Sequence, residues 1–393
     1  METILQHPLF TPLALTVVII AVFPLVAGYV VLVERKVLAD FQVRLGPMRV
    51  GPHGLLQPIA DALKLLLKED IVPAEADRSI FWIAPIISTF TALTAFAMVP
   101  FSSTLYVADV NVGLLVILAM SSVGILGIIL GGWSSNSHYP LLGALRSAAQ
   151  LVSYEVALAF ALLSGLMVAG TLSLRGMVEA QADRGIWFVF DNYGFMIVPF
   201  VIYMVAAVAE TNRAPFDLPE AESELVAGFH TEYSGFRWAL YMLAEYANMF
   251  VVSGVAVTMF WGGWLRPFPS VAWLAPLDYA APFLLFAGSG AGSLLLLVCR
   301  LKDPIQRKVL VAVSLMLMGA GAIFLIPGFN AAAAPVFWFF FKVALILYAL
   351  IWFRGTFPRF RYDQLMNIGW KVMIPLGMAA VMINALLGMT RSS

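Results

Sequence analysis

Long uncharged stretches separate the polar positions of this chain of 393 residues. Between Glu2 and Glu34 lie 31 residues without Asp, Glu, Lys or Arg, and another 33 separate Lys308 from Lys342. A helix needs about 20 predominantly apolar residues to cross a bilayer. Dividing the apolar runs at Gly, Pro and polar breaks predicts ten such helices, at 10–33, 80–100, 112–132, 150–170, 194–210, 239–262, 279–299, 309–327, 335–353 and 372–389. The pattern predicts an all-α polytopic membrane protein, with a single membrane domain over 1–393.

The composition excludes several other classes of protein. The 23 Lys and Arg residues balance 23 Asp and Glu, so no basic excess indicates a nucleic-acid partner. The single cysteine, Cys299, cannot supply the four or so thiolates that hold an iron–sulfur cluster, and the four histidines lack zinc or haem spacing. The chain also lacks a G-x-G-x-x-G motif or phosphate-binding loop. We therefore expect no metal, flavin or iron–sulfur cluster in this chain.

The basic residues of the loops predict the orientation, because cytoplasmic loops of membrane proteins carry an excess of Lys and Arg. With loop 34–79 in the cytoplasm, 18 Lys and Arg residues lie on the cytoplasmic side and four lie outside. Both ends of the chain are therefore predicted to be extracytoplasmic.

Loop 34–79 contains a predicted helix of its own. Its polar residues Gln57, Asp61, Lys64 and Lys68 follow one another at steps of four, three and four, and the positions between them are mostly apolar. That spacing draws one polar stripe along a helix. We expect an amphipathic helix that lies flat at the membrane surface or packs sideways into the bundle.

The predicted cytoplasmic loop 211–238, with the end of the preceding helix, is unusually acidic. Between residues 210 and 232 the only basic residue is Arg213, and the carboxylates are Glu210, Asp217, Glu220, Glu222, Glu224 and Glu232. Glu220 and Glu224 share a helix face, so their titrations are coupled and the group is a candidate for passing protons. Two plainer interpretations stay open. Asp217 and Glu220 fit a helix-capping box, and the loop fits a merely solvated acidic segment.

Two further glutamates lie within predicted spans. Glu155 and Glu245 each lie about six residues, or roughly 9 Å, inside a span. Charges in the membrane are costly and usually serve a function, although a structural ion pair of Glu155 with Arg146, or snorkelling to the interface, is the alternative. Because the outer half of each predicted span lacks Asp and Glu, a proton that enters here would have to leave sideways, into another subunit. Lys342 fits either an electrostatic relay or a structural lysine.

Several of these stretches resemble one family. They are the run Glu34-Arg-Lys and the segments 44–69, 142–155, 210–248 and 361–366. Together they resemble the H-type subunit (subunit 1 in mitochondria) of proton-pumping NADH:quinone oxidoreductase, respiratory complex I. The resemblance covers residues 1–265 and 335–390, and two helices predicted within 279–327 are additional to the usual family pattern.

The resemblance implies a membrane subunit, in the bacterial inner (plasma) membrane, that forms one side of a quinone chamber. It also implies partners among the other membrane and peripheral-arm subunits, as well as lipids, and it implies coupling of quinone reduction to proton translocation. The implied quinone-side residues are Glu34, Arg35, Arg44, Lys64 and Phe236. The acids of the implied proton path are Glu155, Glu210, Glu220, Glu222, Glu224 and Glu245, and Asp217 joins them as a candidate from the acidic loop.

Two alternative functions remain open at this point. A homologous subunit of a membrane-bound hydrogenase shares the architecture and does not require quinone binding. A stand-alone ion transporter belongs to a different class, but the acids lie on one side only and the sequence lacks an evident inverted repeat or paired interrupted helices. The basic quinone-side residues favour the quinone-dependent enzyme.

Overall fold

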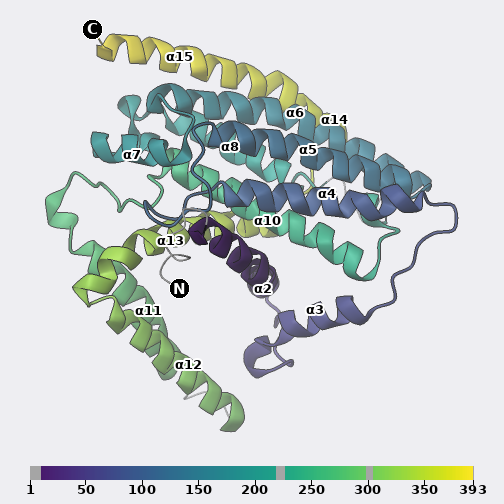
Figure 1. Ribbon diagram of the computed structural model, residues 1–393, viewed down its shortest axis with the longest axis horizontal. Coiled ribbons are helices and arrows are strands. Elements are labelled where there is room, and N and C mark those ends of the chain that lie inside the picture. Colours follow the sequence, from purple (N-terminus) through teal and green to yellow (C-terminus); the bar gives the residue numbers. More distant parts are fainter. Residues whose placement is uncertain (1–9, 218–225, 298–303, 393) are drawn as a thin grey trace.

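The computed structural model of the chain describes residues 10–217, 226–297 and 304–392 (Figure 1). These residues form helices joined by turns, and they contain no β-strand. Seven helical segments of this part of the chain are long and apolar enough to cross a membrane. They are α2 (Phe10–Phe41), α4 (Arg78–Ala97), α5 (Gly113–Ser134), α6 (His138–Ala169), α10 (Gly235–Phe260), α13 (Pro327–Thr356) and the continuous segment of α14 (Tyr362–Asn367), η6 (Ile368–Met373) and α15 (Ile374–Ser392). The prediction of an all-α polytopic membrane protein is confirmed.

The other three predicted spans also coincide with helices. The span at 194–210 is the shorter apolar helix α8 (Ile197–Glu210), and the spans at 279–299 and 309–327 are α11 (Leu277–Leu297) and α12 (Pro304–Ile323). Figure 1 shows α7 (Leu174–Arg184) and the C-terminal end of α15 at one end of the bundle, and α3 (Gln57–Leu67) near the opposite end. We call these the α7 end and the α3 end.

Helix α10 forms the centre of the bundle. From Met249 to Phe260 every residue of α10 is buried, against α4 on one side and α8 and α13 on others. Small residues allow the neighbouring helices to approach closely. A Cβ atom added to Gly127 of α5 would lie 2.2 Å from Ser88 Oγ of α4, and one added to Gly131 would lie 2.2 Å from Tyr241 Oη of α10. The packing of α4, α5 and α10 therefore depends on these glycines.

Helix α3 confirms the amphipathic helix predicted for loop 34–79. It contacts α2 and α10 and has no fully buried residue. Residues of its polar stripe make contacts within α3 and with α2. Gln57 donates to Asp61 Oδ1 (2.9 Å), and Asp61 Oδ2 pairs with Arg35 Nη1 of α2 (2.8 Å). The Lys36 ammonium of α2 also donates to the carbonyl oxygen of His53 (2.6 Å). These contacts hold the segment that contains α3 against the end of α2.

Helices α11 and α12 form a hairpin that extends away from the bundle (Figure 1). The start of α11 is held at one residue, Asp278. Its carboxylate accepts from Trp338 Nε1 (2.8 Å) and pairs with Arg266 Nη1 (3.1 Å), and its carbonyl oxygen accepts from Asn330 Nδ2 (2.9 Å). Polar contacts thus join this end of the hairpin to α13 and to the segment after α10.

Lys342 of α13 lies at the end of α10, with 2% of its surface exposed. Its ammonium donates to the carbonyl oxygens of Trp261 (2.7 Å) and Leu265 (2.8 Å) and lies 4.7 Å from the centre of the Trp187 ring. Trp261 directly follows the last residue of α10, and carbonyls at a helix C-terminus lack partners within the helix and attract a cation. This geometry supports the structural interpretation of Lys342.

Candidate functional site

A group of buried charges lies where α2, α10, α13 and the segment after α8 meet. Its centre is Glu34 of α2, which is 3% exposed. The Glu34 carboxylate accepts from Arg213 Nη1 (2.7 Å), from the Tyr246 hydroxyl (2.8 Å) and from the guanidinium of Arg354. We refer to Glu34, Arg213, Glu245, Tyr246 and Arg354 as the Glu34 cluster.

Arg213 is shared by two carboxylates within this cluster. On one side it pairs with Glu34, and on the other its Nε lies 2.6 Å from Glu245 Oε1. The second contact is an ion pair without the alignment of a hydrogen bond. The guanidinium carbon also lies 4.7 Å from the centre of the Tyr246 ring. Two acids and two arginines balance in charge, which is the condition under which buried charges are tolerated.

The sequence around Arg213 explains how a loop residue enters the bundle. Helix α8 ends at Glu210, and Asn212 adopts a positive φ of 51°, a conformation that asparagine tolerates better than most residues. The buried side chain of Gln150 in α6 donates to the carbonyl oxygens of Ala209 (2.8 Å) and Phe216 (2.8 Å). The turn is thereby fixed on both sides of Arg213.

Asp217 lies beside the cluster and pairs with Arg359, whose Nη2 is 2.8 Å from Asp217 Oδ2. Burial raises the pKa of the Asp217 carboxyl, and the nearby charges of Arg359, Arg354 and Arg213 oppose that rise. This ion pair is a role that the capping interpretation did not include. Glu220, Glu222 and Glu224 lie outside the described residues, so the helix face predicted for them stays a prediction.

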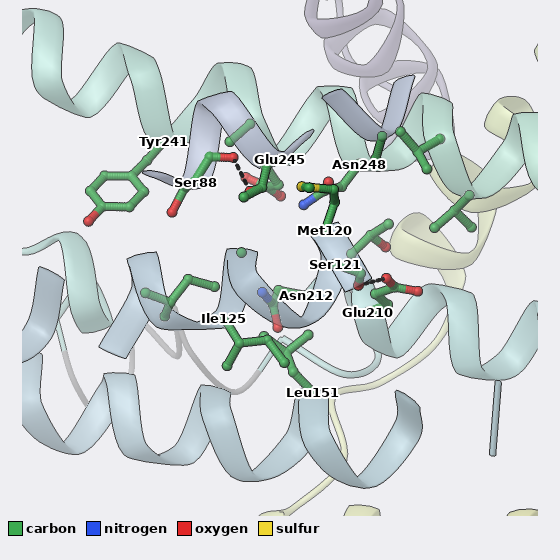
Figure 2. A pocket seen from close by; sticks show the side chains of 18 of the residues that line it. Ser88, Met120, Ser121, Ile125, Leu151, Glu210, Asn212, Tyr241, Glu245 and Asn248 are labelled. Carbon is green, nitrogen blue, oxygen red and sulfur yellow. Dashed lines mark hydrogen bonds between the residues drawn. The ribbon is translucent and has the colours of Figure 1, made fainter. Parts of the chain in front are cut away.

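The three glutamates of the predicted spans line one cavity of about 80 Å³, and Figure 2 labels two of them, Glu210 and Glu245. Glu155 comes from α6, Glu210 from the end of α8 and Glu245 from α10. Two adjacent residues of α5 bind two of these acids, because the hydroxyl of Ser121 donates to Glu210 and that of Ser122 donates to Glu155. We refer to this space as the acid cavity.

The acid cavity continues along polar side chains of α4 and α10. Ser88, Thr91, Tyr241 and Asn248 line it together with the glutamates, and Ser88, Tyr241 and Asn248 are labelled in Figure 2. The cavity has these polar groups among apolar side chains in its wall, and it is large enough to hold more than one water molecule. Glu245 belongs both to this cavity and to the Glu34 cluster. The two groups of charges therefore meet at one residue.

The predicted quinone-side residues differ from one another in burial and in their contacts. Glu34 is buried in the cluster, whereas Arg35 pairs with Asp61 of α3. Arg44 and Lys64 are exposed, and Arg44 Nε donates to Gln42 Oε1 (2.6 Å). The side chain of Phe236, in the first turn of α10, is half exposed. These residues share the region of α2, α3 and the start of α10, but only Glu34 joins the buried charges.

Several residues of this site were missed by reasoning from the sequence. Arg213 stood out only as the single basic residue of an acidic loop, and no local pattern indicated its two partners. The others carried no signal of their own and were found only through the fold: Tyr246, Arg354, Arg359, Ser121 and Ser122.

Comparison with known proteins gives consistent matches over the whole chain. The NADH dehydrogenase family matches residues 13–385. The second H-type subunit of NADH-quinone oxidoreductase in Solibacter usitatus is 73% identical over 390 residues, 99% of each chain. The first H-type subunit in Koribacter versatilis is 51% identical over 96% of this chain and 92% of its own, and the corresponding subunit in Rhodospirillum rubrum is 42% identical over 91% and 88%. The match with the Solibacter protein includes residues 279–327, so that relative has a counterpart of the hairpin.

Proposed function

We propose a quinone-side, proton-coupling role for this chain, which belongs to the NADH dehydrogenase family, the family of the H-type membrane subunit of NADH-quinone oxidoreductase, respiratory complex I. One observation carries the proposal. Glu245 pairs with Arg213 in the Glu34 cluster and also lines the acid cavity, so a change of charge in the cluster acts directly on the cavity.

The quinone side of the proposal rests on α2, α3 and the start of α10. Exposed Arg44 and Lys64 offer cationic donors to a quinone oxygen, and half-exposed Phe236 offers an aromatic face to the ring. Arg35 and Asp61 fix α3 against α2, the helix that carries Glu34. A quinone bound beside α3 is therefore next to α2, the helix that contributes Glu34 to the Glu34 cluster.

The proton side follows from the shared arginine. Reduction of a quinone takes up two electrons and two protons, and the electrons come from other subunits. Proton uptake at the quinone changes the electric field at Glu34. The relative strength of the two ion pairs of Arg213, with Glu34 and with Glu245, changes as a result. A proton gained or lost by Glu245 then exchanges through cavity water with Glu210 and Glu155, which Ser121 and Ser122 orient.

The remaining path is lateral. In the seven long helices and α8, as far as the structure describes them, Asp and Glu are absent between the acid cavity and the α7 end, and Lys342 is bound to backbone carbonyls. The cavity borders α4 and α5, so protons pass to a neighbouring membrane subunit beside those helices. The partners of this proposal are the other complex I subunits, quinone and lipid, in the bacterial plasma membrane.

The alternative functions are disfavoured. The three relatives above are named as subunits of an NADH-quinone oxidoreductase and not of a hydrogenase, and the match covers almost the whole chain. A stand-alone transporter requires a path across the membrane within the chain, whereas the acids that the structure describes inside the seven long helices and α8 lie toward the α3 end.

The experiment that tests the proposal is Glu210→Gln in the assembled complex. We expect quinone-linked NADH oxidation and proton pumping to fall together, by about tenfold or more, because a group that relays protons is lost. Electron transfer from NADH to ferricyanide, an acceptor reached through the peripheral arm, should stay normal. Asp109→Asn is the matched control, since Asp109 contacts the partly exposed Arg175 (3.4 Å) and the hydroxyl of Ser173 (3.3 Å), away from the acid cavity. Normal pumping by Glu210→Gln at equal abundance of the complex would contradict the proposed path.

A further inference from the structure

The segment that follows α3 is joined to the first turn of α10 by a set of polar contacts. Ser234 Oγ accepts from the backbone N–H of Ile71 (3.0 Å) and donates to the carbonyl oxygen of Glu69 (3.3 Å). Arg237 Nε donates to Asp70 Oδ2 at 2.7 Å. We call these contacts the α3–α10 link. They connect positions more than 160 residues apart in the chain.

Arg237 is the most constrained residue of the link. It is 2% exposed, and its guanidinium carbon lies 4.8 Å from the centre of the Phe81 ring and 4.2 Å from that of Trp82. Within the described residues its two terminal nitrogens have no hydrogen-bond partner, so the two ring faces are their main contacts. A planar guanidinium stacks on aromatic faces while its Nε donates to a carboxylate, and a lysine ammonium does not reproduce both contacts. The position thus requires arginine in particular.

Gly235 allows the two segments to approach. Its φ is +55°, in the left-handed region, and a Cβ atom there would lie 3.1 Å from the carbonyl oxygen of Lys68. A larger residue would be strained and would push the end of α3 away from α10. The contact is therefore built into the backbone as well as into the Arg237–Asp70 pair.

The link lies between the two halves of the proposed site. Helix α3 carries Lys64, a predicted quinone-side residue, and Lys68 caps the C-terminus of that helix. Helix α10 begins at Gly235 and carries Glu245 eight residues after Arg237, a rise of about 12 Å. Arg237 itself lies neither in the Glu34 cluster nor among the residues that line the acid cavity. The α3–α10 link therefore joins the proposed quinone side to the helix that carries Glu245, and Arg237 belongs to neither group of site residues.

We propose that Arg237 is a positioning residue that makes α3 and α10 move as one body, so that the state of the quinone beside α3 is transmitted to Glu245. The inference rests on the proposed function. Without the link, a quinone is still reduced, but displacement of α3 no longer moves the acid-bearing helix. The measurable consequence is a loss of coupling and not only a loss of rate.

The experiment compares Arg237→Met, Arg237→Lys, Asp70→Asn and the double variant Asp70→Asn/Arg237→Met in the intact complex. The readouts are protons pumped per NADH oxidised with a short-chain quinone, the KM for that quinone, and NADH–ferricyanide activity. We expect protons per NADH to fall about twofold or more in Arg237→Met. Arg237→Lys should fall less, because it keeps the charge but loses the contact with the rings. The double variant should equal Arg237→Met, since both changes break one interaction.

A residue with only a structural role would lower the abundance of the complex and leave protons per NADH unchanged, and that result would overturn the inference. If Arg237→Met does not assemble, Asp70→Asn decides, because the side chain of Asp70 is partly exposed and its loss leaves the ring contacts in place. Glu210→Gln, measured in the same membranes, keeps the two hypotheses apart. Normal pumping by Glu210→Gln contradicts the proposed proton path through the acid cavity. Unchanged protons per NADH in Arg237→Met and Asp70→Asn contradict only the proposed role of the α3–α10 link.

Discussion

Buried charges are satisfied in two different ways in this molecule. In the Glu34 cluster, charges of both signs share partners, and Arg213 contacts two carboxylates at once. At the end of α10, Lys342 is held by two backbone carbonyls and lies over an aromatic ring. Backbone carbonyls do not change their charge, whereas carboxylates do. The comparison indicates that the cluster can redistribute charge and that the Lys342 site holds it in place.

The largest effect is expected from Arg213→Met. It would leave Glu34 and Glu245 without their shared partner, and breaking a buried ion pair in this way costs about 3–5 kcal/mol. We expect quinone-linked NADH oxidation to fall by about 100-fold or more at equal amounts of complex. The matched control is Arg175→Met, because Arg175 pairs with Asp109 and Glu179 at the surface, where such pairs contribute about 0–1 kcal/mol. A similar loss of quinone-linked NADH oxidation in both variants would show that the Glu34 cluster matters no more than a surface ion pair.

A smaller and different effect is expected from Lys342→Met. The variant loses two charge-assisted hydrogen bonds, each worth about 1.5–3 kcal/mol, so the complex should inactivate at a lower temperature. Protons pumped per NADH should stay unchanged, because carbonyl oxygens do not relay protons. Exposed Lys308 provides the control variant Lys308→Met. A fall in protons per NADH for Lys342→Met would show that Lys342 is a relay, and the contrast with the cluster would disappear.

The helices were largely predictable because hydrophobic periodicity is a local property. The polar stripe predicted α3, and the cost of charge in a membrane singled out Glu155 and Glu245, which the structure brings to one cavity. Helix boundaries were less accurate. Helix α6 begins at His138 rather than at residue 150, and α13 begins at Pro327 and passes through Pro335, where a break was predicted. Proline is tolerated within membrane helices, so it does not mark their ends reliably.

The partners of the acids were not predictable. Arg213 is 179 residues from Glu34 in the sequence, and Arg354 is 320 residues from it. Such pairs exist only because α2, α10 and α13 meet, and no short spacing encodes that meeting. Ser121 and Ser122 had no signal at all, since two serines in an apolar helix look like packing residues until the glutamates of α6 and α8 lie opposite them.

The smallest effect is expected at His230, a third kind of buried polar group near the α3 end. Its ring lies 5.0 Å from that of Phe229 and 6.4 Å from that of Trp238, and its Nδ1 has no hydrogen-bond partner within the described residues. Burial lowers the pKa of His230 from 6.5 to about 4. The opened loop takes up a proton below pH 6.5 while the packed loop stays neutral, so stability is lost as the pH falls from about 6.5 toward 4. The loss of stability should approach roughly 3 kcal/mol at the lower limit.

The experiment follows proteolysis of the 226–234 segment as a function of pH. His230→Phe should remove the increase in proteolysis at acid pH, whereas the control His138→Phe, at an exposed position, should keep it. An unchanged acid profile in His230→Phe would mean that the carboxylates around Asp217, and not the histidine, set the response of this end to acid.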